Sequence, residues 1–214
     1  MANLTQGRRK MRYVAIILVI VVVSTAFAAD NDFSMKFRGQ SYNSTFDQIT
    51  FYPTYKVGDN VSFGSVLLYA KSSEFSTGFK FSNGSSWVWP LVGVLYNAGK
   101  GYGTHFRGSM HLGMETKSIE FVGQNMFDIA NKRATDDTYH RWWLQYKLPR
   151  YNTRIGFQTE ITNVKGKKAT VALGPKFSLL KGDYRFDCFY GKIVQYSGVL
   201  STPMTMRIWL YITM

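Results

Sequence analysis

The sequence has few acidic residues, little charge overall and almost no cysteine. Acids number 13 against 26 Lys and Arg among 214 residues, and charged residues of both signs make up 18% of the chain. Cys188 is the single cysteine, which excludes a fold held by internal disulfides. Residues 31–214 also lack any run near the ~18 consecutive apolar residues that a membrane-spanning helix needs, which excludes a helical membrane bundle.

Motifs for cofactor and metal chemistry are missing too. No Gly-rich phosphate loop follows a strand-like segment, and no Cys/His cluster has the spacing of a zinc site. Asp136-Asp137 alone is a weak signal for calcium. We therefore expect no cofactor and no metal. The basic residues are dispersed over many segments of the chain, which argues against nucleic acid as a partner.

The first 28 residues have the layout of a secretory signal peptide. Residues 8–12 hold four basic side chains, Tyr13 to Val23 is apolar and uncharged, and Ala26-Phe27-Ala28 offers small residues for cleavage. An uncleaved helical anchor is the alternative, because apolar character runs for about 17 residues. Removing residues 1–28 leaves 22 basic and 13 acidic residues, a net charge of +9, on the mature domain 29–214.

Short segments of the mature chain alternate apolar and polar side chains, from Phe33-Ser34-Met35-Lys36-Phe37-Arg38 to the last residue. A period of two places neighbouring side chains on opposite faces of a strand. Every second connection is short and carries turn residues, as in Asn83-Gly84-Ser85 and Lys181-Gly182-Asp183. The twelve strand-like segments lie near 32–41, 45–57, 61–72, 75–82, 86–97, 102–116, 118–128, 138–149, 152–163, 167–179, 184–194 and 202–214.

These features predict an all-β fold: an antiparallel up-and-down transmembrane β-barrel of about twelve strands, with short periplasmic turns and longer outer loops. One face of the segments is apolar and aromatic, with Phe75, Phe79 and Phe81 in one segment and Ile208 and Leu210 in another. That face would contact outer-membrane lipid. The alternative is a secreted soluble barrel or sandwich that binds an acidic ligand, with its apolar face inside.

The opposite face is basic, with only Glu115, Glu120, Glu160 and Asp187 as acids. Inside a barrel, such a face produces a positive field that concentrates anions. We expect anion-selective passage; an unselective or plugged lumen is the alternative. The predicted pore-lining, substrate-binding residues are Lys36, Arg38, Lys56, Lys80, Arg107, Arg141, Lys147, Arg154, Lys168, Lys176, Arg185 and Arg207.

Three stretches carry a resemblance to a known family: the alternating start at 33–38, Val57 to Gly64, and Leu173-Gly174-Pro175-Lys176-Phe177. With the signal peptide and the short strands, the chain resembles the small monomeric oligogalacturonate-specific porin family, which includes sialic-acid-type channels. The resemblance implies a monomeric, passive channel in the outer membrane that passes acidic oligosaccharides along rows of Arg and Lys. Met214 departs from the aromatic residue that usually ends such barrels.

A hydrolase is a less favoured alternative. His105, Ser109, His111 and Glu115 share one face of a segment and include a nucleophile, a base and an acid. Phe106 and its alternating neighbours occupy the lipid-facing side, so this quartet should point into the lumen. We expect no catalytic residues.

We predict that the protein fractionates with the outer membrane and shows a heat-dependent shift on a gel, because a closed barrel resists detergent until it is boiled. Membrane fractionation followed by electrophoresis of heated and unheated samples measures both properties. A chain that is soluble without detergent would contradict the pore and favour the secreted binding barrel.

Overall fold

The computed structural model describes residues 32–42, 45–69, 72–97, 103–129, 137–164, 168–195 and 204–213. The predicted signal peptide lies outside these residues, as does Met214. In the described part of the chain, no helix is long and apolar enough to cross a bilayer.

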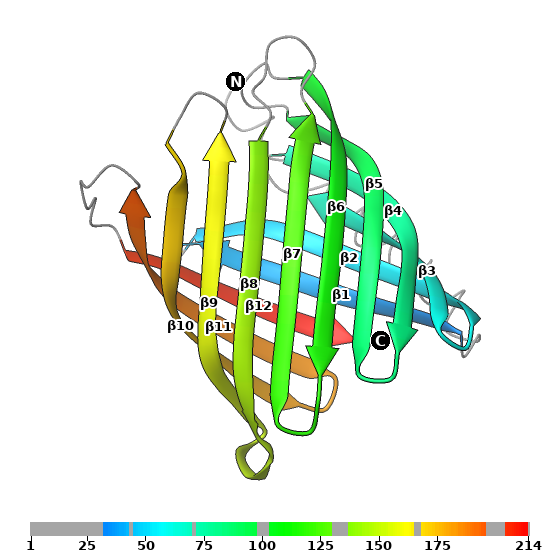
Figure 1. Ribbon diagram of the computed structural model, residues 1–214, viewed down its shortest axis with the longest axis vertical. Helices are drawn as coiled ribbons and strands as arrows, with labels where there is room; N and C mark the ends of the chain where they lie inside the picture. The colour runs from blue at the N-terminus through cyan, green and yellow to red at the C-terminus, as the bar shows by residue number, and fades with distance from the viewer. Residues whose placement is uncertain are drawn as a thin grey trace, which may run out of the picture.

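Twelve antiparallel strands form one closed barrel (Figure 1). Each strand pairs with its neighbours in the sequence, and the last strand pairs with the first from Lys36↔Thr213 to Tyr42↔Arg207. The strands are β1 (Phe33–Tyr42), β2 (Thr45–Gly58), β3 (Val61–Tyr69), β4 (Ser72–Asn83), β5 (Ser86–Asn97), β6 (Gly103–Glu115), β7 (Ile119–Ile129), β8 (Asp137–Leu148), β9 (Thr153–Val164), β10 (Thr170–Lys181), β11 (Tyr184–Gln195) and β12 (Met204–Thr213). The prediction of a twelve-strand up-and-down barrel is confirmed, with strand ends that differ by at most three residues.

The five short connections lie at one end of the barrel, together with the start of β1 and the end of β12 (Figure 1); they join β2 to β3, β4 to β5, β6 to β7, β8 to β9 and β10 to β11. We call this the turn end. Gly84 and Gly182 each have φ 56°, and Asn152 has φ 49° after the short 3-10 turn η1 (Pro149–Tyr151). Gly and Asn are the residues that adopt this left-handed conformation most readily, which is why these positions make close turns.

The outer surface of the barrel is apolar, as predicted. Phe157 is 68% exposed, and Phe75, Leu144, Leu173 and Leu210 are also exposed. A soluble barrel would bury this face instead, so the arrangement contradicts that alternative and provides the apolar belt that lipid requires.

The inner residues are buried at the level that we call the waist. Each strand contributes one residue to this level, and none of these twelve residues is more than 9% exposed. Neighbours in this set are either direct partners in the strand register or displaced by two residues, so they form one ring. The waist residues are Arg38, Thr50, Val66, Ser76, Leu91, Ser109, Gln124, Arg141, Gln158, Lys176, Asp187 and Trp209.

We predict that Phe157→Arg lowers the free energy of unfolding by about 2–4 kcal/mol, because Phe157 lies outward near the middle of β9, where a bilayer solvates charge poorly. Urea unfolding of the barrel in lipid vesicles measures the change. Phe157→Leu is the matched control and should unfold near the wild-type midpoint. Equal midpoints for the two variants would show that this face does not contact lipid.

Candidate functional site: a cation-lined cavity at the turn end

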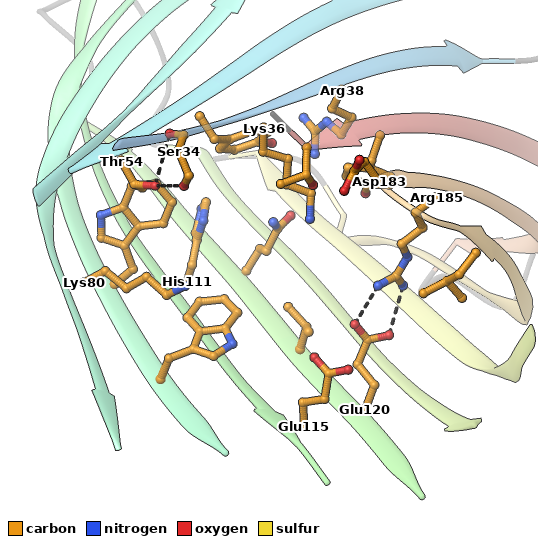
Figure 2. Close-up of a pocket in the computed structure, with 18 of the residues that line it drawn as sticks. Ser34, Lys36, Arg38, Thr54, Lys80, His111, Glu115, Glu120, Asp183 and Arg185 are labelled. Carbon is orange, nitrogen blue, oxygen red and sulfur yellow. Dashed lines mark hydrogen bonds and ion pairs between the residues drawn. The ribbon is translucent and has the colours of Figure 1, made fainter. Parts of the chain in front are cut away.

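A cavity of about 580 Å³ lies inside the barrel between the waist and the turn end. Its lining begins at the waist residues Arg38 and Gln124 and reaches Gly182 and Asp183 in the β10–β11 turn. Figure 2 shows side chains from opposite sides of the barrel converging on this space. The cavity is therefore built from the turn-side halves of the strands.

Five of the predicted pore-lining residues line this cavity: Lys36, Arg38, Lys80, Arg154 and Arg185. Another five are not in the cavity lining but contact inward-facing partners in the lumen: Arg107, Arg141, Lys147, Lys176 and Arg207. Lys56 is exposed at the end of β2, and Lys168 is exposed two residues before β10 begins. The structure thus places ten of the twelve predicted residues inside the barrel and two at its rims.

Carboxylates neutralise much of the predicted basic face. Glu120 contacts Arg154 Nη1 at 2.9 Å and Arg185 Nη1 at 2.7 Å. Arg185 also binds Asp187 at 2.6 Å, and Asp187 binds Lys176 at 2.9 Å. Because Arg185 on β11 and Glu120 on β7 stand four strands apart, this contact crosses the lumen (Figure 2).

Glu115 extends this chain of alternating charges along the wall. Its Oε1 lies 2.7 Å from Lys147 Nζ and 3.0 Å from Arg154 Nη2. Two arginines, Arg154 and Arg185, therefore each bridge two carboxylates. We call Glu115, Glu120, Asp187 and their basic partners the ion-paired sector.

Two acids missing from the sequence prediction neutralise Arg107. Its Nη1 lies 2.5 Å from Glu74 Oε2, and its Nε lies 2.5 Å from Asp128 Oδ1. Glu74 lies just before the strand-like segment predicted at 75–82. It is an even number of positions away from Lys80, so it lies on the same, inward face. Asp128 likewise shares the parity of Glu120. The lumen is consequently less positive than the sequence analysis predicted, because that analysis counted only four acids on the inward face.

Four inward cations remain without a carboxylate oxygen within 4 Å among the described residues: Lys36, Arg38, Lys80 and Arg141. Aromatic rings support them instead. Lys36 Nζ lies 4.7 Å from the centroid of Tyr211, Arg38 Cζ lies 5.4 Å from Tyr52, and Lys80 Nζ lies 5.0 Å from Trp87. Arg141 lies over both Trp143 and Trp209. A ring attracts a cation without cancelling its net charge.

Three of these four cations line the cavity, and we call them the ring-supported cations: Lys36, Arg38 and Lys80. Those on β1 face the ion-paired acids of β6 and β7 across the cavity (Figure 2). β1 and β7 are six positions apart in a ring of twelve strands, which makes them diametrically opposed. One wall of the cavity is therefore net positive, whereas the other is close to neutral.

Glycine residues leave room for two indole rings that line the cavity. A Cβ on Gly113 would stand 2.5 Å from Cε2 of Trp87, and one on Gly64 would stand 2.8 Å from Cζ2 of Trp89. Such distances are too short for a real side chain. Glycine at these two positions therefore leaves room for the indole rings, and Trp87 is in place beneath Lys80.

The side chains of His105, Ser109 and His111 on β6 face inward, as predicted from the alternation of this strand. Ser109 Oγ, His105 Nε2 and His111 Nε2 are buried and have no hydrogen-bond partner among the described residues. A nucleophile activated by a base needs a hydrogen bond between the two. No Ser–His pair of this kind is assembled within the described strands. In the same residues no group of three or more His, Cys, Asp and Glu side chains is placed to hold a metal.

Comparisons with known proteins support the fold. No family model and no curated protein matches the chain. The barrel is similar to the solved KdgM porin, with 10% identity, a TM-score of 0.54, and coverage of 84% of this chain and 98% of that one. It is also similar to the NanC porin, with 13% identity, a TM-score of 0.54, and coverage of 83% and 98%.

A third structure comes from a study of the in-meso crystallization of membrane proteins, with 10% identity, a TM-score of 0.61, and coverage of 85% and 83%. The predicted resemblance to small porins is confirmed at the level of fold. A closed barrel with a lipid-compatible exterior and the porin fold supports the expected outer-membrane location.

We predict that Glu120→Gln lowers the free energy of unfolding by about 3–5 kcal/mol, because it removes the carboxylate shared by two poorly solvated guanidinium groups. Urea unfolding of the refolded barrel measures this. Asp59→Asn is the control. Asp59 forms an exposed ion pair with Lys56 at 3.9 Å, and exposed pairs of this kind contribute little, so the midpoint should stay unchanged. Similar midpoints for Glu120→Gln and the wild type would show that the ion-paired sector does not hold the barrel together.

Proposed function

We propose that the protein is a passive outer-membrane channel whose lumen favours anions, in particular acidic oligosaccharides. The observation that carries the proposal is the cavity wall formed by the ring-supported cations. Their charge faces the cavity without a carboxylate partner in the described strands. Low-dielectric walls focus such a field and raise the local concentration of anions.

The chemistry of this wall suits a charged sugar. Arg38 and the two lysines provide charge-assisted donors for carboxylates. Tyr52, Trp87 and Tyr211 line the same cavity, and flat rings pack against the apolar faces of pyranoses. One solved structure of the similar KdgM porin is in complex with disordered oligogalacturonate. We infer that an acidic oligosaccharide is the solute for this barrel too.

Short turns usually face the periplasm in outer-membrane barrels. In that orientation the cavity is the periplasmic vestibule of the channel. A solute that enters from outside the cell would then pass the waist before it reaches this vestibule. Weak binding at the cationic wall permits release, as passive conduction requires.

The buried waist favours a second function, an outer-membrane barrel that binds an anion without conducting it. Arg141 on β8 lies 5.2 Å from the ring centroid of Trp209 on β12, and Lys176 lies 4.4 Å from the same ring. The first contact joins strands four apart across the lumen, and the second joins β10 to β12, two strands apart. Passage requires these side chains to move, whereas binding from the turn end does not.

We predict that bilayers containing the protein show reversal potentials that favour chloride over potassium under a salt gradient. Digalacturonate should block the current more strongly than neutral maltose. Replacing Lys36, Arg38 and Lys80 together with Ser should reduce both effects, because it removes the charges without carboxylate partners.

The control triple variant replaces Lys56, Lys168 and Lys181 with Ser. It removes the same charge from exposed positions outside the cavity, so selectivity should stay near the wild-type value. Cation selectivity in the wild type, or equal loss in both triple variants, would contradict the proposal. A membrane-inserted protein that carries no current would favour binding without passage.

A further inference from the structure

We propose that the floor of the cavity is an oxyanion-binding site, in which Arg38, His111 and Trp143 donate hydrogen bonds to one carboxylate or phosphate group. This inference deepens the proposed function and rests on it, since it assigns atoms to the anion site of the same cavity. All three residues line the cavity. The three residues lie on three different strands, β1, β6 and β8 respectively.

Each of the three residues carries a buried nitrogen that lacks a hydrogen-bond partner among the described residues. These nitrogens are Arg38 Nε, His111 Nε2 and Trp143 Nε1. The residues are 5%, 3% and 7% exposed. Buried polar atoms in proteins are nearly always hydrogen-bonded, so three unpaired nitrogens in residues that line one cavity point to an acceptor supplied by a ligand.

The other buried tryptophans show that Trp143 is exceptional. Trp89 Nε1 donates to the carbonyl oxygen of Gly78 at 3.2 Å, and Trp209 Nε1 donates to Gln40 Oε1 at 2.6 Å. The barrel thus supplies an acceptor for each of these two indoles. The indole N–H of Trp143 instead belongs to a residue of the cavity floor.

Neighbouring contacts hold the three side chains in place. Arg38 Nη2 donates to Thr50 Oγ1 at 2.9 Å, and Arg38 Nε is buried without a partner among the described residues. The ring of His111 stands edge-on to Trp89, with centroids 6.0 Å apart. Arg141 and Lys176 lie over the ring of Trp143 at 5.5 and 4.8 Å.

The charge and the donor set select an anion. Arg38 and Trp143 are donors only, and His111 supplies a third N–H in the tautomer protonated at Nε2. Lys36 and Lys80 line the same cavity without carboxylate partners in the described part of the chain. Since Arg38 is also a waist residue, a bound oxyanion stops at the level where the lumen closes.

The test is a titration of the refolded protein in micelles, followed by the indole ¹H–¹⁵N signals of its five tryptophans. Trp143→Phe identifies the Trp143 signal. Trp142→Phe identifies the matched control, an indole on the neighbouring residue of β8 that faces outward. The probes are glucuronate, inorganic phosphate and neutral glucose.

We expect the Trp143 signal to shift saturably with glucuronate, with phosphate or with both, while the Trp142 signal stays in place. The stronger of the two probes identifies the group that the site prefers. Arg38→Lys keeps the charge but loses the Nε–H, and His111→Phe keeps a ring but loses both nitrogens. Each should weaken the binding of that probe about tenfold or more, as expected for a lost hydrogen bond to a charged group. Retention of the heat-dependent gel shift shows that these variants are folded.

An unmoved Trp143 signal with both oxyanions, or an equal shift with glucose, would overturn the site. An anion-selective current without an indole shift would overturn the site and leave the channel standing. A saturable shift in a protein without current would overturn the channel and leave the site standing.

Discussion

Closure of the sheet between β1 and β12 is the constraint on which the rest of the structure depends. Within a bilayer, water does not satisfy backbone N–H and C=O groups, so a strand edge exposed to lipid is costly. Pairing from Lys36↔Thr213 to Tyr42↔Arg207 removes that edge. Once the sheet is closed, every strand must present one face to lipid and the other to the interior. The alternation of apolar and polar residues follows from this geometry.

Closure also concentrates charge in a small interior. Twelve strands leave limited room, so basic side chains from distant parts of the sequence meet the same acids. Glu120 forms ion pairs with both Arg154 and Arg185, and Asp187 forms ion pairs with both Arg185 and Lys176. Poorly hydrated cations need such partners or another source of stabilisation. Ion pairs supply it in one sector, and aromatic rings supply it for the ring-supported cations.

This division gives the basic residues two roles. A guanidinium between two carboxylates contributes to the structure and has little charge to offer a solute. Lys36, Arg38 and Lys80 keep their field, because the rings beneath them carry no net charge. The features that the proposed solute would meet are thus gathered in the cavity at the turn end, below a waist of buried side chains.

The sequence by itself determined the fold class, the positions of the tight turns and the inward face on which ten of the twelve predicted basic residues lie. A period of two depends only on local backbone geometry, and Gly and Asn mark left-handed turn residues directly. Only the tertiary structure decided which charges remain without carboxylate partners. The sequence places Arg38 and Arg185 on the same face, yet Arg185 contacts Glu120 four strands away around the ring, whereas Arg38 contacts Thr50 and Tyr52 of the neighbouring strand. The position of Glu74 beside Arg107, two strands away, and the presence of Arg38, His111 and Trp143 in the lining of one cavity likewise arise from barrel curvature and side-chain packing. Neither curvature nor packing is encoded in a local pattern.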